Sequence, residues 1–147
     1  MSIDPVIQGL LDRQAITDTL LRYASTIDAK DYVRLRTLFA EDIRATFGPG
    51  TTLNGADEFL AWIQEKTKDC SWQHHFLNVY HVDIDGDRAT TLTYHTSHQT
   101  LVGAPDTVKV LVARYDDTLR RTDGTWKIAT KDMHVGWSEE RTRVPTS

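Results

Sequence analysis

Four long stretches rich in β-branched and aromatic residues fill the second half of the chain, and they constrain the fold more than any other feature. Three breaks rich in turn-forming residues separate them: Asp-Gly-Asp at 85–87, Gly-Ala-Pro-Asp at 103–106 and Asp-Gly at 123–124. Asp-Gly favours a tight hairpin, because glycine supplies the positive φ that the turn needs. This pattern predicts a four-stranded antiparallel meander. The predicted strands are 72–84, 89–101, 107–121 and 125–137.

The first half of the chain carries apolar residues at helical spacing instead. They predict a helix over 12–29 with Asp12 as its N-cap, because a side-chain oxygen there accepts from the unpaired backbone N–H groups of the first turn. Asp31 is the expected cap of a second, short helix, and a strand over 43–47 and a helix over 56–68 follow. The stripe of the first helix consists of Ile16, Leu20, Tyr23, Ala24 and Ile27.

Helices followed by a meander indicate an α+β fold, in which an antiparallel sheet carries its helices on one side. Strands of about a dozen residues twist strongly, so the sheet is expected to curl around the helices and enclose a cone-shaped pocket. The length of 147 residues suits a single domain over 1–147. The polar stretch 138–147 is expected to be a flexible tail.

Composition argues against several kinds of partner. The formal net charge is -4 and no run of lysine or arginine forms a basic stripe, so nucleic acid is not an expected partner. No stretch approaches the roughly 18 apolar residues that would span a membrane, and the amino terminus lacks a signal-peptide pattern. Cys70 is the single cysteine, so no disulfide forms within the chain, and a cytoplasmic location is expected.

Polar residues at positions expected to face the pocket are the candidates for chemistry. Asp28 follows the last residue of the helical stripe, which places it near the mouth of the cavity. Strand alternation puts His75 on one face of its strand and His74 on the other, and a bulge would exchange the two. On the next strand, either His95 or His98 is expected to face the pocket, and the pattern leaves that choice open.

An aspartate beside a histidine is suited to proton transfer. Neutral imidazole accepts a proton near neutral pH, and a carboxylate bonded to one ring nitrogen fixes the tautomer and stabilises the imidazolium. In a dry pocket such a pair abstracts a proton next to a carbonyl and returns it elsewhere. The sequence contains no GxGxxG, P-loop, HExxH or nucleophile-elbow motif, so neither a cofactor nor a metal is expected.

Several segments of the chain resemble those of the scytalone dehydratase-like proteins, within the SnoaL-like, NTF2-like superfamily. The segment IDAKDYVRLRTL at 27–38 is similar to the one that bears the catalytic aspartate of that family, and QHHFL at 73–77 to the one that bears its catalytic histidine. The pairs YH at 94–95 and HQ at 98–99 are similar to a third active-site segment, and DGTWKI at 123–128 to the closing hairpin of the superfamily.

The resemblance, which extends over residues 8–138, implies a cone-shaped α+β barrel with cofactor-free proton-transfer chemistry: dehydration, dehydrohalogenation, isomerisation or cyclisation. It implies that Asp28 is the orienting carboxylate, that His75 is the general acid or base, and that His98 or His95 is the second histidine. It also implies a homodimer or a homotrimer.

Departures from the family pattern point to a different substrate. The tyrosines that hold a catalytic water in the family fall at Ile27 and Phe47 here, and Tyr23, one turn earlier, is the candidate for a replacement hydroxyl. A serine and an asparagine of the family fall at Ala113 and Tyr115. We therefore expect a lyase or isomerase that acts on a small, largely hydrophobic carbonyl or cyclic substrate. The expected substrate-binding residues are Ile27, Phe47, His95, Trp62 and Tyr115.

Two other functions are compatible with the resemblance. Many members of the superfamily bind a ligand or a partner without catalysis, as the small subunits of ring-hydroxylating dioxygenases do, and this is the alternative function. An epoxide hydrolase needs an Asp-Arg-Asp arrangement in the pocket, for which Asp132 and Arg114 are the candidates.

Overall fold

The structure is a computed structural model, and it describes residues 2–144. Three helices and six strands follow one another in the order helix, helix, two strands, helix, four strands, as the pattern of periodicities predicts apart from one short strand. The elements are α1 (Pro5–Asp28), α2 (Tyr32–Thr37), β1 (Phe39–Phe47), β2 (Thr52–Asn54), α3 (Ala56–Thr67), β3 (Cys70–Asp85), β4 (Arg88–Leu101), β5 (Ala104–Thr122) and β6 (Thr125–Thr142).

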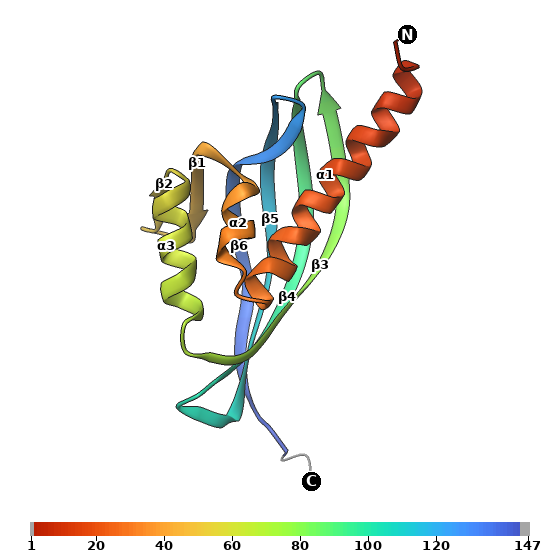
Figure 1. Ribbon diagram of the computed structural model, residues 1–147. Coiled ribbons are helices and arrows are strands. Elements are labelled where there is room, and N and C mark those ends of the chain that lie inside the picture. Colours follow the sequence, from red (N-terminus) through yellow and green to blue (C-terminus); the bar gives the residue numbers. More distant parts are fainter. Residues whose placement is uncertain (1, 145–147) are drawn as a thin grey trace.

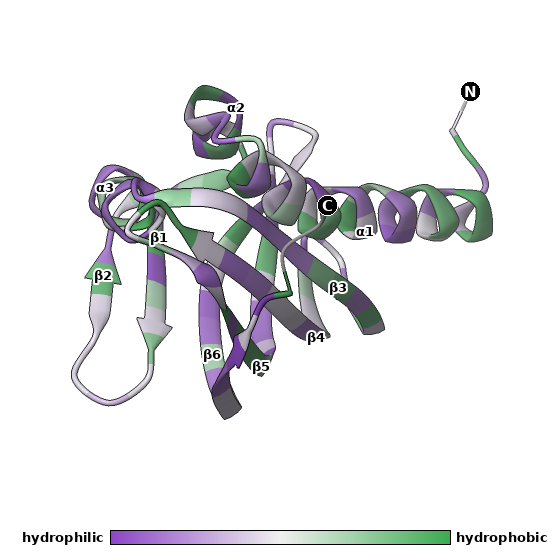
Figure 2. Cartoon of the chain, turned by 90° about the horizontal axis from the view of Figure 1, so that it is seen from below, coloured by the Kyte–Doolittle hydropathy of each residue, from purple (hydrophilic) through white to green (hydrophobic). Residues whose placement is uncertain are grey.

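All six strands belong to one sheet in the order β2-β1-β6-β5-β4-β3 (Figure 1). The strands β3 to β6 form an antiparallel meander, and β1 joins it by running parallel to β6. Figure 2 shows these long strands curving on one side while the helices lie on the other. The predicted α+β fold, a curved and mostly antiparallel sheet with amino-terminal helices, is confirmed. No helix in residues 2–144 has the length and apolarity needed to cross a membrane.

The first helix begins earlier than predicted, at Pro5, and Asp4 rather than Asp12 is its N-cap. The Asp4 carboxylate accepts a hydrogen bond from the Val6 backbone N–H at 2.8 Å. The first turns of α1 extend beyond the sheet (Figure 1), so the buried stripe starts well inside the helix. The sequence pattern located the beginning of that stripe and not the beginning of the helix. The predicted cap of α2 is confirmed, since Asp31 accepts from the Arg34 N–H at 3.1 Å.

The predicted strands differ from the observed ones mainly in β1, β2 and β6. β1 starts at Phe39 rather than at residue 43, and the short strand β2 was not predicted. The expected flexible tail is corrected for 138–142, because β6 continues to Thr142 and pairs with β5 as far as Thr107. Most side chains of this stretch are exposed, so it lacks the alternation of polar and apolar residues that marks a strand. Residues 145–147 lie outside the described part of the chain.

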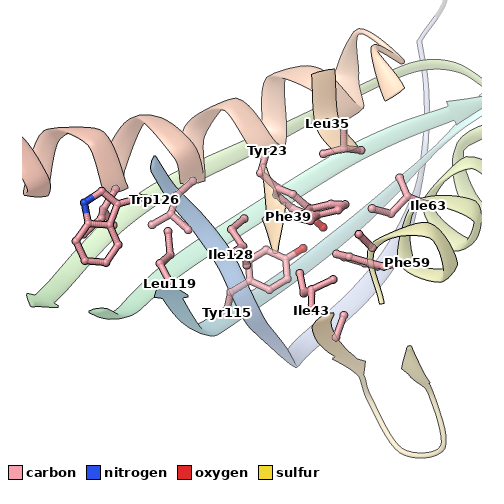
Figure 3. Close-up of a cluster of buried hydrophobic side chains, with 14 of the residues drawn as sticks. Tyr23, Leu35, Phe39, Ile43, Phe59, Ile63, Tyr115, Leu119, Trp126 and Ile128 are labelled. Atoms are coloured by element: carbon pink, nitrogen blue, oxygen red, sulfur yellow. The ribbon is translucent and has the colours of Figure 1, made fainter. Parts of the chain in front are cut away.

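The hydrophobic core lies between α1 and the inner face of the sheet (Figure 3). Near the amino-terminal half of α1 it contains Leu119, Trp126 and Ile128, and near the other half an aromatic group contributed by α1, β1 and α3. Phe39 and Phe59 are fully buried there, with ring centroids 4.8 Å apart. Each such side chain stabilises the fold by about 1.5–3 kcal/mol through removal of apolar surface from water. A cavity lies next to this aromatic group, and Tyr23 belongs to its lining.

Candidate functional site

A cavity of about 290 Å³ lies between the end of α1, α3 and the inner faces of β3 to β6. Seven of the nine predicted site residues line it, namely Tyr23, Ile27, Phe47, Trp62, His75, His95 and Tyr115. The sequence did not single out the other lining residues, which are Ile63, Lys66, Thr67, Ser97, Gln99, Leu111 and Met133. The walls of the cavity are mainly aromatic and aliphatic, and their polar groups come from β3 and β4, from the two tyrosines and from the end of α3. Such a cavity suits a small apolar molecule with one or two polar atoms.

Asp28 and His75 meet at the wall of this cavity. The Asp28 carboxylate accepts two hydrogen bonds from His75: its Oδ1 lies 2.7 Å from the ring Nδ1, and its Oδ2 lies 2.9 Å from the backbone nitrogen. With both oxygens engaged, the carboxylate and the imidazole are held in one orientation. Nδ1 carries the proton in this contact when the carboxylate is ionised, so Nε2 is the ring nitrogen that can accept another.

Two further contacts fasten the end of α1 to the start of β3 and so fix the position of Asp28. The Gln73 side-chain amide donates from Nε2 to the Ile27 backbone carbonyl at 2.8 Å. The Lys30 Nζ donates to the Cys70 carbonyl at 2.9 Å. Ile27 belongs to the last turn of α1 and Cys70 is the first residue of β3. The two bonds therefore join the end of the helix to the start of the strand and hold Asp28 beside His75.

The sheet register decides which histidines share the cavity. His75 pairs with Ser97 across β3 and β4, so Ser97 and His95 lie on the cavity side, whereas His98 lies on the outer side. There the His98 ring stacks on the ring of His74, with centroids 4.8 Å apart. Of the two histidines that the sequence left open, His95 therefore shares the cavity with His75, and the choice of His98 as a catalytic residue is corrected. His95 and His98 are three residues apart on one strand, so they face opposite sides.

His95 is buried between two rings, with 2% of its surface exposed. Its ring stacks on Tyr115 at 4.9 Å and on His75 at 5.6 Å between centroids. Burial, with smaller contributions from the charges of His75 and Lys131, lowers the pKa of His95 to about 3. The imidazole is therefore neutral near neutral pH. It is suited to giving or accepting a hydrogen bond and not to carrying the charge of a proton taken from a substrate.

A buried ion pair, which the sequence analysis did not predict, lies against the rings of Tyr23 and Tyr115. Lys131 Nζ is 2.5 Å from Asp117 Oδ2, and both side chains are almost fully buried. The same Nζ lies 3.9 Å from the ring centre of Tyr115 and 4.3 Å from that of Tyr23. Burial raises the pKa of both phenols, and the charge of Asp117 adds to this, so both hydroxyls stay protonated.

A bulge explains why the sequence pattern does not reveal Lys131. The register of β5 and β6 shifts between Thr118 and Leu119, so that Ile128 and Lys131 both face inward although three positions separate them. A period of two counted from Ile128 predicts that Lys131 faces solvent. No local composition signal marks this inversion.

The other predicted arrangements are not assembled at the cavity. Arg114 lies on the outer face with Asp116, 3.3 Å away, and about half of the Asp132 side chain is exposed. The Asp-Arg-Asp arrangement that an epoxide hydrolase needs is therefore not formed by these residues. Within residues 2–144, no group of three or more histidine, cysteine, aspartate and glutamate side chains converges in a way that could hold a metal ion.

The sequence model of the SnoaL-like domain matches residues 8–132. Among solved structures, a protein provisionally assigned as a scytalone dehydratase, from Novosphingobium aromaticivorans DSM 12444, has a TM-score of 0.85 and 19% identity, over 95% of this chain and 96% of that chain. A type 2 hexachlorocyclohexane dehydrochlorinase, LinA, has a TM-score of 0.85 and 17% identity, over 96% of each chain.

An NTF2-like protein with a cystatin-like fold, also from Novosphingobium aromaticivorans, has a TM-score of 0.72 and 24% identity, over 88% of this chain and 85% of that chain. A search of curated proteins by sequence gave no significant match. At such low identities these solved structures establish a shared fold, and they leave the chemistry to be argued from the site itself.

Proposed function

Because the chain belongs to the SnoaL-like domain family, we propose that it is a cofactor-free lyase or isomerase of small, largely hydrophobic carbonyl or cyclic substrates. One observation carries this proposal: the carboxylate of Asp28 bonds to His75 Nδ1 at 2.7 Å, at the wall of an apolar cavity. A protein that only binds apolar ligands has no need of an acid and a base in contact at that wall. An enzyme that moves protons does.

In the proposed reaction, His75 Nε2 takes a proton from the carbon next to a carbonyl group. In a dehydration, the electron pair of the broken C–H bond forms a C=C double bond while the hydroxyl on the neighbouring carbon departs with the electrons of its C–O bond, and the imidazolium gives its proton to this hydroxide, which leaves as water. In an isomerisation no group leaves: the electron pair of the C–H bond moves into an enolate, and the imidazolium returns the proton to a different carbon. Asp28 stabilises the imidazolium in both cases, and a positioned acid–base group of this kind contributes about 10²- to 10⁴-fold in rate.

The remaining polar groups of the cavity suit the oxygen of such a substrate. A carbonyl that develops negative charge is stabilised by donors that are already in place. His95 is neutral and lies next to His75, and Tyr23 and Tyr115 present hydroxyls that burial keeps protonated. In this proposal His95, and not His98, takes the second-histidine role, with Tyr23 as the neighbouring hydroxyl. The apolar wall formed by Phe47 and Trp62, whose rings are 4.4 Å apart, holds the hydrocarbon part.

The names of two proteins with similar structures support an elimination reaction. One is provisionally assigned as a scytalone dehydratase and the other is a hexachlorocyclohexane dehydrochlorinase. Both names describe lyases that form a double bond as a small group leaves. These names support the class of reaction, and the volume and lining of the cavity support the proposed class of substrate.

Deuterium exchange tests the base without knowledge of the natural substrate. The protein is incubated in D2O with a panel of one- and two-ring ketones, and incorporation of deuterium next to the carbonyl is followed by NMR. We expect exchange with the wild-type protein and at least a 10²-fold slower rate with His75→Ala and Asp28→Asn. His74→Ala is the matched control, because His74 is the neighbouring residue on the opposite face of β3.

Exchange that persists in His75→Ala, or that falls equally in His74→Ala, would show that His75 is not the base. If ketones of the panel bind in the cavity but none of them incorporates deuterium, the result would favour the alternative function, a subunit that binds ligands or partners without catalysis. Far-UV circular dichroism of each variant separates a loss of chemistry from a loss of folding.

A further inference from the structure

Buried polar atoms without a hydrogen-bond partner gather on one side of the sheet. In residues 2–144 such side-chain atoms belong to six residues, and all but His98 lie on the inner face. The inner five are Gln73, Thr91, Thr93, His95 and Asp117. In folded proteins most buried polar atoms are bonded, and ordered water satisfies many of those that the protein itself does not. Five such residues on one face are therefore a feature to be explained.

Three of these residues form a continuous line along β4. Thr91, Thr93 and His95 alternate with outward-facing residues and are all buried, so they share the inner face. Residues two apart on a strand are separated by about 6.7 Å. One water molecule with two hydrogen bonds spans about 5.5 Å, and two waters in succession span about 8 Å, so one or two waters join neighbouring side chains of this line.

The line connects the cavity to the buried ion pair. At one end, His95 lines the cavity, and both of its ring nitrogens lack a partner among the described residues. At the other end, Thr91 lies directly opposite Asp117, which in turn lies opposite Lys131. Asp117 Oδ2 bonds to Lys131, whereas Oδ1 lacks a partner in the described part of the chain. Each residue along this line, from Asp117 to His95, thus has a side-chain atom that can still form a hydrogen bond.

We propose that ordered water molecules occupy the inner face of β4 and form a hydrogen-bonded chain from Asp117 through Thr91 and Thr93 to the ring of His95. Asp117 is then a positioning residue: through the waters it determines which ring nitrogen of His95 carries the proton. His75 needs no such chain, because Asp28 holds its tautomer by a direct contact. This inference concerns the protein without substrate and does not depend on the proposed reaction.

Direct observation of water is the first test. We expect a crystal structure at high resolution, or water–protein cross-relaxation by NMR, to find ordered water within about 2.7–3.2 Å of Thr91 Oγ1, Thr93 Oγ1 and a ring nitrogen of His95. An inner face of β4 that is dry in the wild-type protein would overturn the proposal, whatever the behaviour of any variant.

Replacement of Thr93 by valine is the second test, because the two side chains have nearly the same shape and valine carries a methyl group in place of the hydroxyl. If water bonds to that hydroxyl, Thr93→Val breaks the chain: the melting temperature falls and the ring ¹⁵N chemical shifts of His95 change, while those of His75 stay the same. If the face is dry, valine removes an unsatisfied hydroxyl: the melting temperature rises and the His95 shifts stay constant. The second outcome would overturn the proposal.

Two further variants make this readout specific to the chain. Thr93→Ser keeps the hydroxyl, so we expect the His95 shifts of the wild-type protein even if the stability changes. Thr96→Val is the matched control on the opposite face of β4, and we expect no change in the His95 shifts. Asp117→Asn keeps an oxygen and removes the charge, and it must alter the His95 shifts if the chain reaches Asp117. Unchanged shifts in Asp117→Asn would contradict the positioning role.

Discussion

Replacement of Lys131 by methionine should unfold the protein far more easily, because it leaves the carboxylate of Asp117 buried without its partner. The two side chains are 1% and 0% exposed and lie 2.5 Å apart. Loss of one partner from such a pair costs about 3–5 kcal/mol. Unfolding entropies near 2.1 cal/mol/K per residue give ~0.3 kcal/mol/K for a chain of this length. The expected fall in melting temperature for Lys131→Met is therefore roughly 10–16 °C.

The loss should also depend on pH. Burial raises the pKa of Asp117, and contact with Lys131 opposes this rise. In Lys131→Met the opposing contact is gone, so the folded state holds a proton on Asp117 more tightly than the unfolded state, where the pKa is about 3.9. The unfolded state then binds fewer protons, and the stability of the variant falls as pH rises through the folded pKa. The stability gap between variant and wild type should be smaller at pH 5 than at pH 8.

Thermal unfolding followed by circular dichroism at pH 5 and pH 8 measures this gap, with urea titration for the free energy of unfolding. The double variant Lys131→Met/Asp117→Leu should recover most of the loss, because it leaves no buried charge. Lys109→Met is the matched control: its ion pair with Glu140 is 3.9 Å long and exposed, and its loss should cost less than about 1 kcal/mol. A double variant no more stable than Lys131→Met, or a single variant within about 1 kcal/mol of wild type at pH 8, would refute the reasoning.

Three further predictions concern other parts of the molecule. The pKa of His95 is lowered to about 3 from the ordinary 6.5, so the free energy of unfolding of the wild-type protein should fall by up to about 4–5 kcal/mol as pH falls from 6.5 towards 3. His95→Leu should therefore unfold at a lower pH than the wild-type protein, and an unchanged acid midpoint would contradict this. Asp12→Asn should cost about 1–3 kcal/mol in urea titrations, because its carboxylate accepts from Trp126, Arg121 and Gln8, whereas the exposed control Asp18→Asn should cost little. A chain shortened to 1–137 loses the part of the β5–β6 ladder beyond residue 137, which should lower the free energy of unfolding by about 1–3 kcal/mol and the melting temperature, measured by calorimetry, by several degrees. An equal melting temperature would mean that this stretch adds no stability.

Local features of the sequence determined most of the secondary structure. Glycines in the two Asp-Gly breaks have positive φ in the structure, 59° at Gly86 and 78° at Gly124, as the hairpin prediction requires. The apolar stripe of the first helix is buried, and the four long strands occur where β-branched residues concentrate. These properties depend on neighbours in the sequence, so a linear pattern contains them. The pairing of Asp28 with His75 was expected from the resemblance to a family, and their contact in space agrees with that expectation.

Only the tertiary structure decided which side chains share the cavity. A shift of one residue in strand register moves every side chain to the opposite face, and register depends on contacts between strands that are far apart in the chain. The pairing of His75 with Ser97 brings His95 to the cavity and leaves His98 outside, and the bulge at Thr118 and Leu119 turns Lys131 inward. Burial then makes His95 a neutral hydrogen-bonding group. The sequence pattern thus determined the strands, and the resemblance singled out Asp28 and His75, whereas the register of the strands determined which side chains surround these two residues.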